Sequence, residues 1–335
     1  MGRMCLTLIG DLFIRPGGVL EMLMRFNALR ALRPPKDLAA KVASVPYDVV
    51  NRNEAAALAA GNPVSFLHIC RPDIDLPEDM DPHDDAMYAK GRENLERFQA
   101  EGTLVRDDEP GIYIYRLVMR GKAQTGIVGC VHIDDYEHDL IKKHEKTRRD
   151  KEDDRTRHVL EMNANAEPVF LTYKDDAELA RLMAEAVKAE ALYDFTAVDG
   201  VRHTMWKAPA VEGYIKAFGR VPHVYVADGH HRCASAWRAG KERREGNAGH
   251  TGNEEYNWFL AVLFPASEVR ILSYNRVVKD LNGQTPAQVL EKLKGVGKVS
   301  ATDIPTPPGS GSFCVYLDKK WHRVDIDEKT IDRND

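Results

Sequence analysis

Apolar positions in this chain follow two different spacings. Two runs rich in β-branched and aromatic residues, 111–119 and 124–133, flank Arg120-Gly121-Lys122 and predict a β-hairpin. After Asp175 the apolar residues recur at intervals of three and four, which predicts an amphipathic helix capped by that aspartate. The apolar positions of this helix are Leu179, Leu182, Met183, Ala186 and Val187.

The remaining pattern alternates short apolar runs with helix formers. Residues 54–60 are strong helix formers, with Asn51 or Asn53 as the predicted N-cap and Gly61-Asn62-Pro63 as the stop. Ser65–Cys70 predicts a strand closed by Arg71-Pro72. Further strands are predicted at 168–173, 258–264, 312–317 and 321–326. The fold class expected from this pattern is α+β, with mixed β-sheets and packed helices.

Residues 223–236 predict a short buried strand that passes through a tight turn into a helix. The turn is Asp228-Gly229-His230-His231-Arg232. A helix start leaves backbone N–H groups unpaired and carries positive partial charge, so it favours an anion. One carboxylate, two imidazoles and one guanidinium can hold phosphate oxygens and exchange a proton. The same sequence can also be a capping turn with no further role.

Composition narrows the class of protein. The chain has 335 residues, of which 43% are apolar, with 47 Lys and Arg against 52 Asp and Glu and a net charge of -5. This charge predicts no general attraction to nucleic acid. The five cysteines include no Cys-x-x-Cys pair, which disfavours structural zinc and a disulfide framework and favours a reducing cytoplasm. No run of about eighteen apolar residues predicts a membrane span.

The length allows one large domain or two smaller ones. We expect residues 1–24 to be a poorly structured leader, or an over-called start before Met24, and residues 25–335 to form one large domain. Two lobes are expected within it, 25–175 and 176–335. Because the chain ends soon after a predicted edge strand, we also expect native sequence to follow Asp335.

Three polar clusters are candidates for chemistry: Tyr47-Asp48, the segment 144–147 with Asp154-Arg155, and the turn 228–232. Tyr47-Asp48 alone is also typical of a turn, and the charged segment is also typical of a solvated surface. Together they provide cations, carboxylates and imidazoles, which phosphoryl transfer requires. His144-Glu145 lacks the second histidine of a zincin, and the chain has no Walker loop, protein-kinase set or Gly-x-Gly-x-x-Gly after a strand.

At these clusters the chain resembles a widespread bacterial and archaeal family, the domain of unknown function numbered 1015, from about Phe26 onward. Members of that family normally continue beyond the end of this chain. The matching segments are Asn27–Arg30, Arg33–Pro35, Pro46–Val49, Asn62–His68, Arg71-Pro72, His144–Thr147, Asn165–Phe170 and Asp228–Arg232. The turn 228–232 also looks like the phosphate-binding turn of the ParB and sulfiredoxin superfamily, which includes kinases of free L-serine.

The resemblance implies a ParB/sulfiredoxin-like core with large insertions and a role for each motif residue. Gly229, His230, His231 and Arg232 would hold phosphates, and Asp228 would bind Mg²⁺ or orient a serine hydroxyl. Asp48, Asp228 and His230 are the alternative catalytic bases. The family-typical residues His144, Glu145, Thr147 and Arg155 would lie on a loop that closes over the substrate. His144, Thr147 and Arg155 would be further phosphate ligands, and the substrate or lid residues would be Tyr47, Glu145 and Lys146.

The activity implied is transfer of a phosphoryl group from pyrophosphate, ATP or ADP to free L-serine, giving O-phosphoserine. A ParB-like nucleotide-binding regulator is an alternative, although it normally has a basic face. Hydrolysis of a phosphoester at the same site is another. A sulfiredoxin reaction is disfavoured because it needs a cysteine directly after the turn glycine, where this chain has His230, and Cys233 lies one helical turn later.

Overall fold

The computed structural model describes residues 13–14, 20–21, 23–81, 83–271 and 275–330. It divides into two compact units, Met1–Val269 and Arg270–Asp335. The lobe boundary expected after residue 175 therefore differs from the unit boundary, and strands from both sides of residue 175 belong to one sheet of the first unit. Most of the expected leader lies outside the described residues, but Met24 at its end is buried in the core.

The first unit is built on a mixed sheet, which has nine strands among the described residues. The pairs β13/β9 and β12/β8 are parallel, and the other neighbours are antiparallel. The strands in spatial order are β10 (Tyr193–Thr196), β11 (Arg202–Lys207), β6 (Tyr113–Met119), β7 (Lys122–His132), β13 (Trp258–Pro265), β9 (Val169–Tyr173), β12 (Val224–Asp228) and β8 (Ile141–Lys142), with β3 (Phe26–Asn27) also on β7. The mixed α+β class is confirmed.

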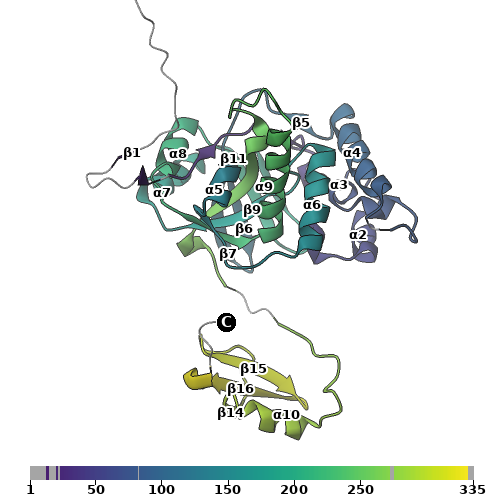
Figure 1. The fold of residues 1–335 in the computed structure, drawn as a ribbon, viewed down its shortest axis with the longest axis vertical. Coiled ribbons are helices and arrows are strands. Elements are labelled where there is room, and N and C mark those ends of the chain that lie inside the picture. The colour runs from purple at the N-terminus through teal and green to yellow at the C-terminus, as the bar shows by residue number, and fades with distance from the viewer. Residues whose placement is uncertain (1–12, 15–19, 22, 82, 272–274, 331–335) are drawn as a thin grey trace, which may run out of the picture. The chain divides into compact units, whose positions relative to one another are not determined.

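Helices pack against this sheet and extend beyond it, with α9 across the strands and α6 beside it (Figure 1). The helices of the first unit are α1 (Ala39–Val42), α2 (Arg52–Ala59), α3 (Leu67–Cys70), α4 (Asp85–Ala100), α5 (Ile133–Glu137), α6 (Arg149–Met162), α7 (Ala177–Ala186), α8 (Val211–Phe218) and α9 (His230–Glu245). Single 3-10 turns are η1 (Tyr47–Val49), η2 (Pro72–Asp75), η3 (Glu255–Asn257) and η4 (Ala266–Glu268). Two short strand pairs lie apart from the main sheet: β1 (Phe13–Ile14) pairs with β2 (Leu20–Glu21), and β4 (Leu32–Arg33) pairs with β5 (Val105–Arg106).

Several local predictions are confirmed by these elements. The hairpin joins β6 to β7, and Asn51 caps α2 in a capping box with Glu54. The amphipathic helix is α7, whose cap is Asp176 rather than Asp175. The strand predicted at Ser65–Cys70 is wrong, because Leu67–Cys70 form the short helix α3.

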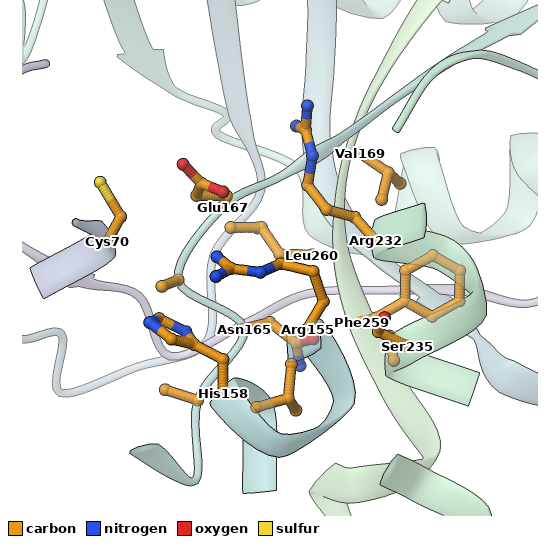
Figure 2. A pocket seen from close by; sticks show the side chains of 14 residues that line it. Cys70, Arg155, His158, Asn165, Glu167, Val169, Arg232, Ser235, Phe259 and Leu260 are labelled. Atoms are coloured by element: carbon orange, nitrogen blue, oxygen red, sulfur yellow. The ribbon is translucent and has the colours of Figure 1, made fainter. Parts of the chain in front are cut away.

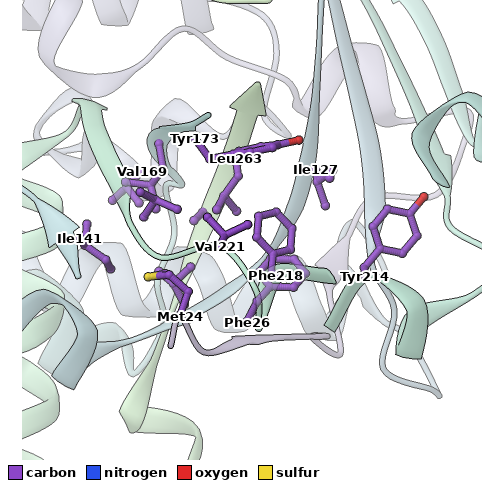
Figure 3. Packing of buried hydrophobic residues seen from close by; sticks show 14 of the residues in the cluster. Met24, Phe26, Ile127, Ile141, Val169, Tyr173, Tyr214, Phe218, Val221 and Leu263 are labelled. Atoms are coloured by element: carbon purple, nitrogen blue, oxygen red, sulfur yellow. The ribbon is translucent and has the colours of Figure 1, made fainter. Parts of the chain in front are cut away.

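The main core lies between the sheet and the helices packed on it (Figure 3). The rings of Phe26 and Phe218 have centroids 4.3 Å apart, and both side chains are at most 3% exposed. Phe26 also covers Gly129 of β7, where an added Cβ would lie 2.2 Å from the ring. Such close packing fixes β3 on the sheet.

The described part of the second unit is a small sheet with one helix. Its strands are β14 (Gly297–Thr302), β16 (Lys320–Ile326) and β15 (Ser312–Leu317) in spatial order, all antiparallel, with α10 (Pro286–Leu293) before them and η5 (Glu328–Thr330) after them. The β15/β16 hairpin confirms the prediction for 312–326. Val324 is fully buried in this unit.

Candidate functional site

The candidate site is built around the turn between β12 and α9. Gly229 joins them with φ 92° and ψ 35°, a left-handed conformation that glycine adopts without strain. No side chain among the described residues caps α9, and its first turn contains no acidic residue. The turn therefore presents open amides and positive partial charge, as an anion site requires.

Arg232 connects this turn to a distant part of the chain. Its Nη1 donates to the carbonyl of Pro168 at 2.7 Å, and its Nη2 lies 3.0 Å from Asp228 Oδ2 and 3.5 Å from Asp48 Oδ2. The side chain of Arg232 is only 14% exposed. Burial lowers its pKa, but the carboxylates of Glu167, Asp48 and Asp228 outweigh this and raise the pKa overall. Arg232 thus stays charged and positions two carboxylates.

His230 is the buried member of the turn, with 5% of the residue exposed. Its Nδ1 lies 3.5 Å from Glu145 Oε2, and its ring meets the ring of His144 edge-on with centroids 4.4 Å apart. Its Nε2 is buried and has no hydrogen-bond partner among the described residues. Burial and, after it, the charge of His144 lower the pKa of His230. A neutral imidazole with one unused nitrogen is suited to bind a ligand oxygen.

The segment 143–148 covers the start of α9. His231 Nε2 accepts a hydrogen bond from the backbone N–H of Arg148 at 3.2 Å, and Lys146 is exposed. Thr147 donates its hydroxyl to Glu152 of α6, which in turn pairs with Arg238 of α9 at 3.2 Å. The structure thus brings His144, Glu145 and His231 together, whereas the hydroxyl of Thr147 bonds to α6.

Arg155 was expected on a loop that closes over the substrate, but it lies within α6. Its guanidinium carbon is 4.2 Å from the centroid of the Tyr47 ring, and its Nε donates to Asp154 at 2.8 Å. The backbone N–H of Tyr47 donates to Glu167 Oε1 at 3.2 Å. Burial raises the pKa of Tyr47 to about 12. Tyr47 therefore holds a guanidinium on its ring and a carboxylate on its amide.

Glu167 is the site residue that sequence reasoning did not select. Burial raises the pKa of its carboxyl, while Arg232 is the strongest of the groups that lower it. The segment 165–170 supported the family resemblance, but the contact with Tyr47, 120 positions away, depends on the fold. The sequence signal that could have selected Glu167 is its position within this family-matching segment.

A small pocket lies next to Arg232, and Figure 2 shows the side chains around it. The guanidinium of Arg155 points toward the space between Glu167 and His158 (Figure 2). Water-sized groups can occupy about 30 Å³ of this pocket. Its polar lining residues are Arg155, His158, Asn165, Glu167, Arg232 and Ser235.

Within the described part of the chain, no group of three or more His, Cys, Asp or Glu residues is placed to hold a metal ion. Asp48 and Asp228 are nevertheless 44% and 66% exposed and converge on one guanidinium nitrogen. Mg²⁺ in phosphoryl-transfer sites is commonly bound by one or two carboxylates together with substrate phosphates. The residues present fit that kind of shared site.

Comparison with known families decides the identity of the chain. The model of the family described as "Protein of unknown function (DUF1015)" matches residues 26–334. The chain belongs to this family. No curated protein and no solved structure matches it. No helix in the described ranges is long and apolar enough to cross a membrane.

Proposed function

We propose that this DUF1015 protein is a phosphotransferase that moves a phosphoryl group to the hydroxyl of free L-serine, giving O-phosphoserine. The observation that carries the proposal is the convergence on the start of α9 of two exposed carboxylates and a buried imidazole with an unused nitrogen. We assign the strand-turn-helix 224–245 to a phosphate-binding core of the ParB and sulfiredoxin type. The donor would be pyrophosphate, ATP or ADP.

In this proposal the turn binds the donor. The first amides of α9 and Nε2 of His230 would donate hydrogen bonds to phosphate oxygens, and His231 would border the same site. His144, Glu145 and Lys146 would cover the donor from the segment after β8. Arg232 would act indirectly, because its bonds hold Asp48 and Asp228 in place.

The chemical step requires removal of a proton from a weak nucleophile. The serine oxygen would form a bond to phosphorus as the bridging P–O bond of the donor breaks, and the leaving phosphate would take that electron pair. Asp48 or Asp228 would accept the hydroxyl proton, or His230 would do so if its Nε2 is unprotonated and does not donate to the phosphate. Arg232 contacts Oδ2 of each carboxylate, so Oδ1 of each would be the oxygen that faces the substrate. Mg²⁺, when bound by Asp228 or Asp48 and the phosphates, would neutralise charge on the transferred group.

The exposure of both carboxylates also favours a second candidate, hydrolysis, because water can reach the same groups. The two activities differ only in the acceptor. Phosphate released in the absence of L-serine would identify hydrolysis.

The test is incubation of the full chain with Mg²⁺, L-serine and each donor separately, with O-phosphoserine measured by mass spectrometry. We expect product with at least one donor and a loss of about 10²- to 10⁴-fold in Asp48→Asn or Asp228→Asn, as for removal of a general base. Asp194→Asn is the matched control, since Asp194 also pairs with an arginine, Arg202, but on the β10/β11 hairpin. Absence of product with all donors would overturn the proposal.

A further inference from the structure

We propose that the pocket beside Arg232 recognises the acceptor as a free zwitterionic amino acid, with Glu167 binding its ammonium group and Arg155 its carboxylate. This inference rests on the proposed function and specifies its substrate class. A peptide does not carry both charged groups on one α-carbon, and a hydroxy acid has no ammonium group, so both would be excluded.

One residue holds both charged groups at the pocket. Tyr47 donates its backbone N–H to Glu167 Oε1 at 3.2 Å, and its ring lies 4.2 Å below the guanidinium carbon of Arg155. Nε and Nη2 of Arg155 each lie 2.8 Å from Asp154 Oδ2, so Nη1 is the guanidinium nitrogen that Asp154 does not use. Oε2 of Glu167 is likewise not used by Tyr47. A ligand thus finds a donor and an acceptor that are already oriented.

The charges of the pocket walls also match a zwitterion. The other titratable walls of the pocket are neutral at pH 7, because burial lowers the pKa of His158 to about 3 and raises the pKa of the Cys70 thiol. Both arginines of the pocket stay charged beside carboxylates, Arg232 next to Asp48 and Asp228 and Arg155 next to Asp154. The pocket thus presents groups of both signs, among them the carboxyl group of Glu167 and the guanidinium of Arg155. This pair is complementary to a ligand that carries one charge of each sign.

The size and position of the pocket limit what the ligand can be. The space of about 30 Å³ has room for about two water-sized groups, so an ammonium nitrogen and one carboxylate oxygen can enter it and a large side chain cannot. Arg232 lines this pocket and also binds Asp228 and Asp48. An amino acid held at Glu167 and Arg155 can therefore extend a short hydroxymethyl group past Arg232 toward the proposed bases.

The test compares three acceptors with the donor found to support turnover. L-Serine has both charged groups, L-glycerate lacks the ammonium, and ethanolamine lacks the carboxylate. We expect L-serine to have a KM at least about 10-fold lower than either analogue, as one charge-assisted hydrogen bond predicts. Glu167→Gln should raise the KM for L-serine about 10-fold and leave the KM for L-glycerate unchanged. Arg155→Met should raise the KM for L-serine by a similar factor and leave the KM for ethanolamine unchanged.

Matched controls come from the same helix. Arg157→Met removes an arginine that lies 4.2 Å over the ring of Tyr88, and Glu161→Gln removes a carboxylate that pairs with Arg92. Neither control should alter the order of the three acceptors. The inference would be overturned if Glu167→Gln or Arg155→Met lost activity equally with all three acceptors. It would also be overturned if the unmodified protein had equal KM values for them.

Calorimetric titration with L-serine in the absence of donor separates this inference from the proposed function. If L-serine binds, both substitutions weaken the binding and no donor gives phosphoserine, then the pocket assignment is kept and the phosphotransferase is rejected. If turnover occurs without the expected acceptor pattern, then the phosphotransferase is kept and the pocket assignment is rejected. Neither binding nor turnover would reject both.

Discussion

Arg232 binds Asp48, a residue 184 positions earlier in the chain, with 3.5 Å between Nη2 and Oδ2. The same nitrogen lies 3.0 Å from Asp228. Without Arg232 these two carboxylates would repel each other, since like charges at short range disfavour one another. The guanidinium therefore makes it possible for two negative groups to face one ligand site.

The first prediction is that Arg232→Lys lowers phosphotransfer by about 10- to 100-fold, because an ammonium cannot bond to Pro168 O and both carboxylates in the same geometry. Loss of one hydrogen bond to a charged group costs about 1.5–3 kcal/mol. The measurement is kcat/KM for L-serine. Arg202→Lys, at the Asp194 pair of the β10/β11 hairpin, is the control and should retain activity. Unchanged activity in Arg232→Lys would show that the two carboxylates do not depend on the guanidinium.

Local sequence signals predicted the elements that carry the site better than the contacts between them. The turn at Gly229 was predictable because a strand, a glycine and a helix follow one another within a few residues. Ser65–Cys70 was mispredicted because a short apolar run does not distinguish a strand from a buried helix. In the structure its first turn is fixed by a hydrogen bond from Phe66 N to Val42 O, which no local pattern indicates.

Pairing of distant groups was the part that sequence could not provide. Glu167 and Tyr47 meet only because η1 and the segment before β9 are brought together, and the Arg155–Tyr47 stacking depends on α6 lying beside η1. The charged segment 142–158 is more typical of a solvated surface, yet Thr156 and His158 are buried in it. A helix that buries a few positions among many charges gives a weak periodic signal.

The second prediction concerns the pH dependence of activity. Burial and His144 lower the pKa of His230, so the imidazole is neutral at pH 7 and becomes protonated only below its ordinary value of 6.5. If the neutral form works as base or ligand, kcat/KM should fall as the pH drops through that lowered pKa. His230→Gln should remove this acidic limb along with most of the activity. His250→Gln, at the loop between α9 and β13, should leave the profile unchanged, and an acidic limb that survives in His230→Gln would assign it to another group.

The third prediction concerns the pH dependence of stability. Burial lowers the pKa of His158 to about 3 and that of His132 to about 4, both below the ordinary value of 6.5. The unfolded chain therefore binds more protons in this range, so the stabilising contribution is complete above pH 6.5 and is lost as the pH falls from 6.5 toward 4 and 3. Urea unfolding between pH 7.5 and 4.5 measures the slope.

His158→Gln should flatten that slope, whereas His138→Gln, at an exposed position after α5, should not. The comparison uses the slope and not the absolute stability, because replacement of a fully buried side chain also changes packing. Identical slopes in the unmodified protein and His158→Gln would place the pH sensitivity elsewhere.

The fourth prediction tests the packing that fixes β3 on the sheet. An added Cβ at Gly129 would lie 2.2 Å from the ring of Phe26, which is itself in contact with Phe218. Because the ring is 3% exposed and has little room to move, Gly129→Ala should lower the free energy of unfolding by about 1–3 kcal/mol, as overpacking of cores does. Gly219→Ala is the control, since its added Cβ would meet nothing closer than 3.5 Å in an ordinary right-handed conformation. If both variants unfold at the same denaturant concentration as the unmodified protein, the ring of Phe26 must be able to leave this position, and β3 would then contribute little to the sheet.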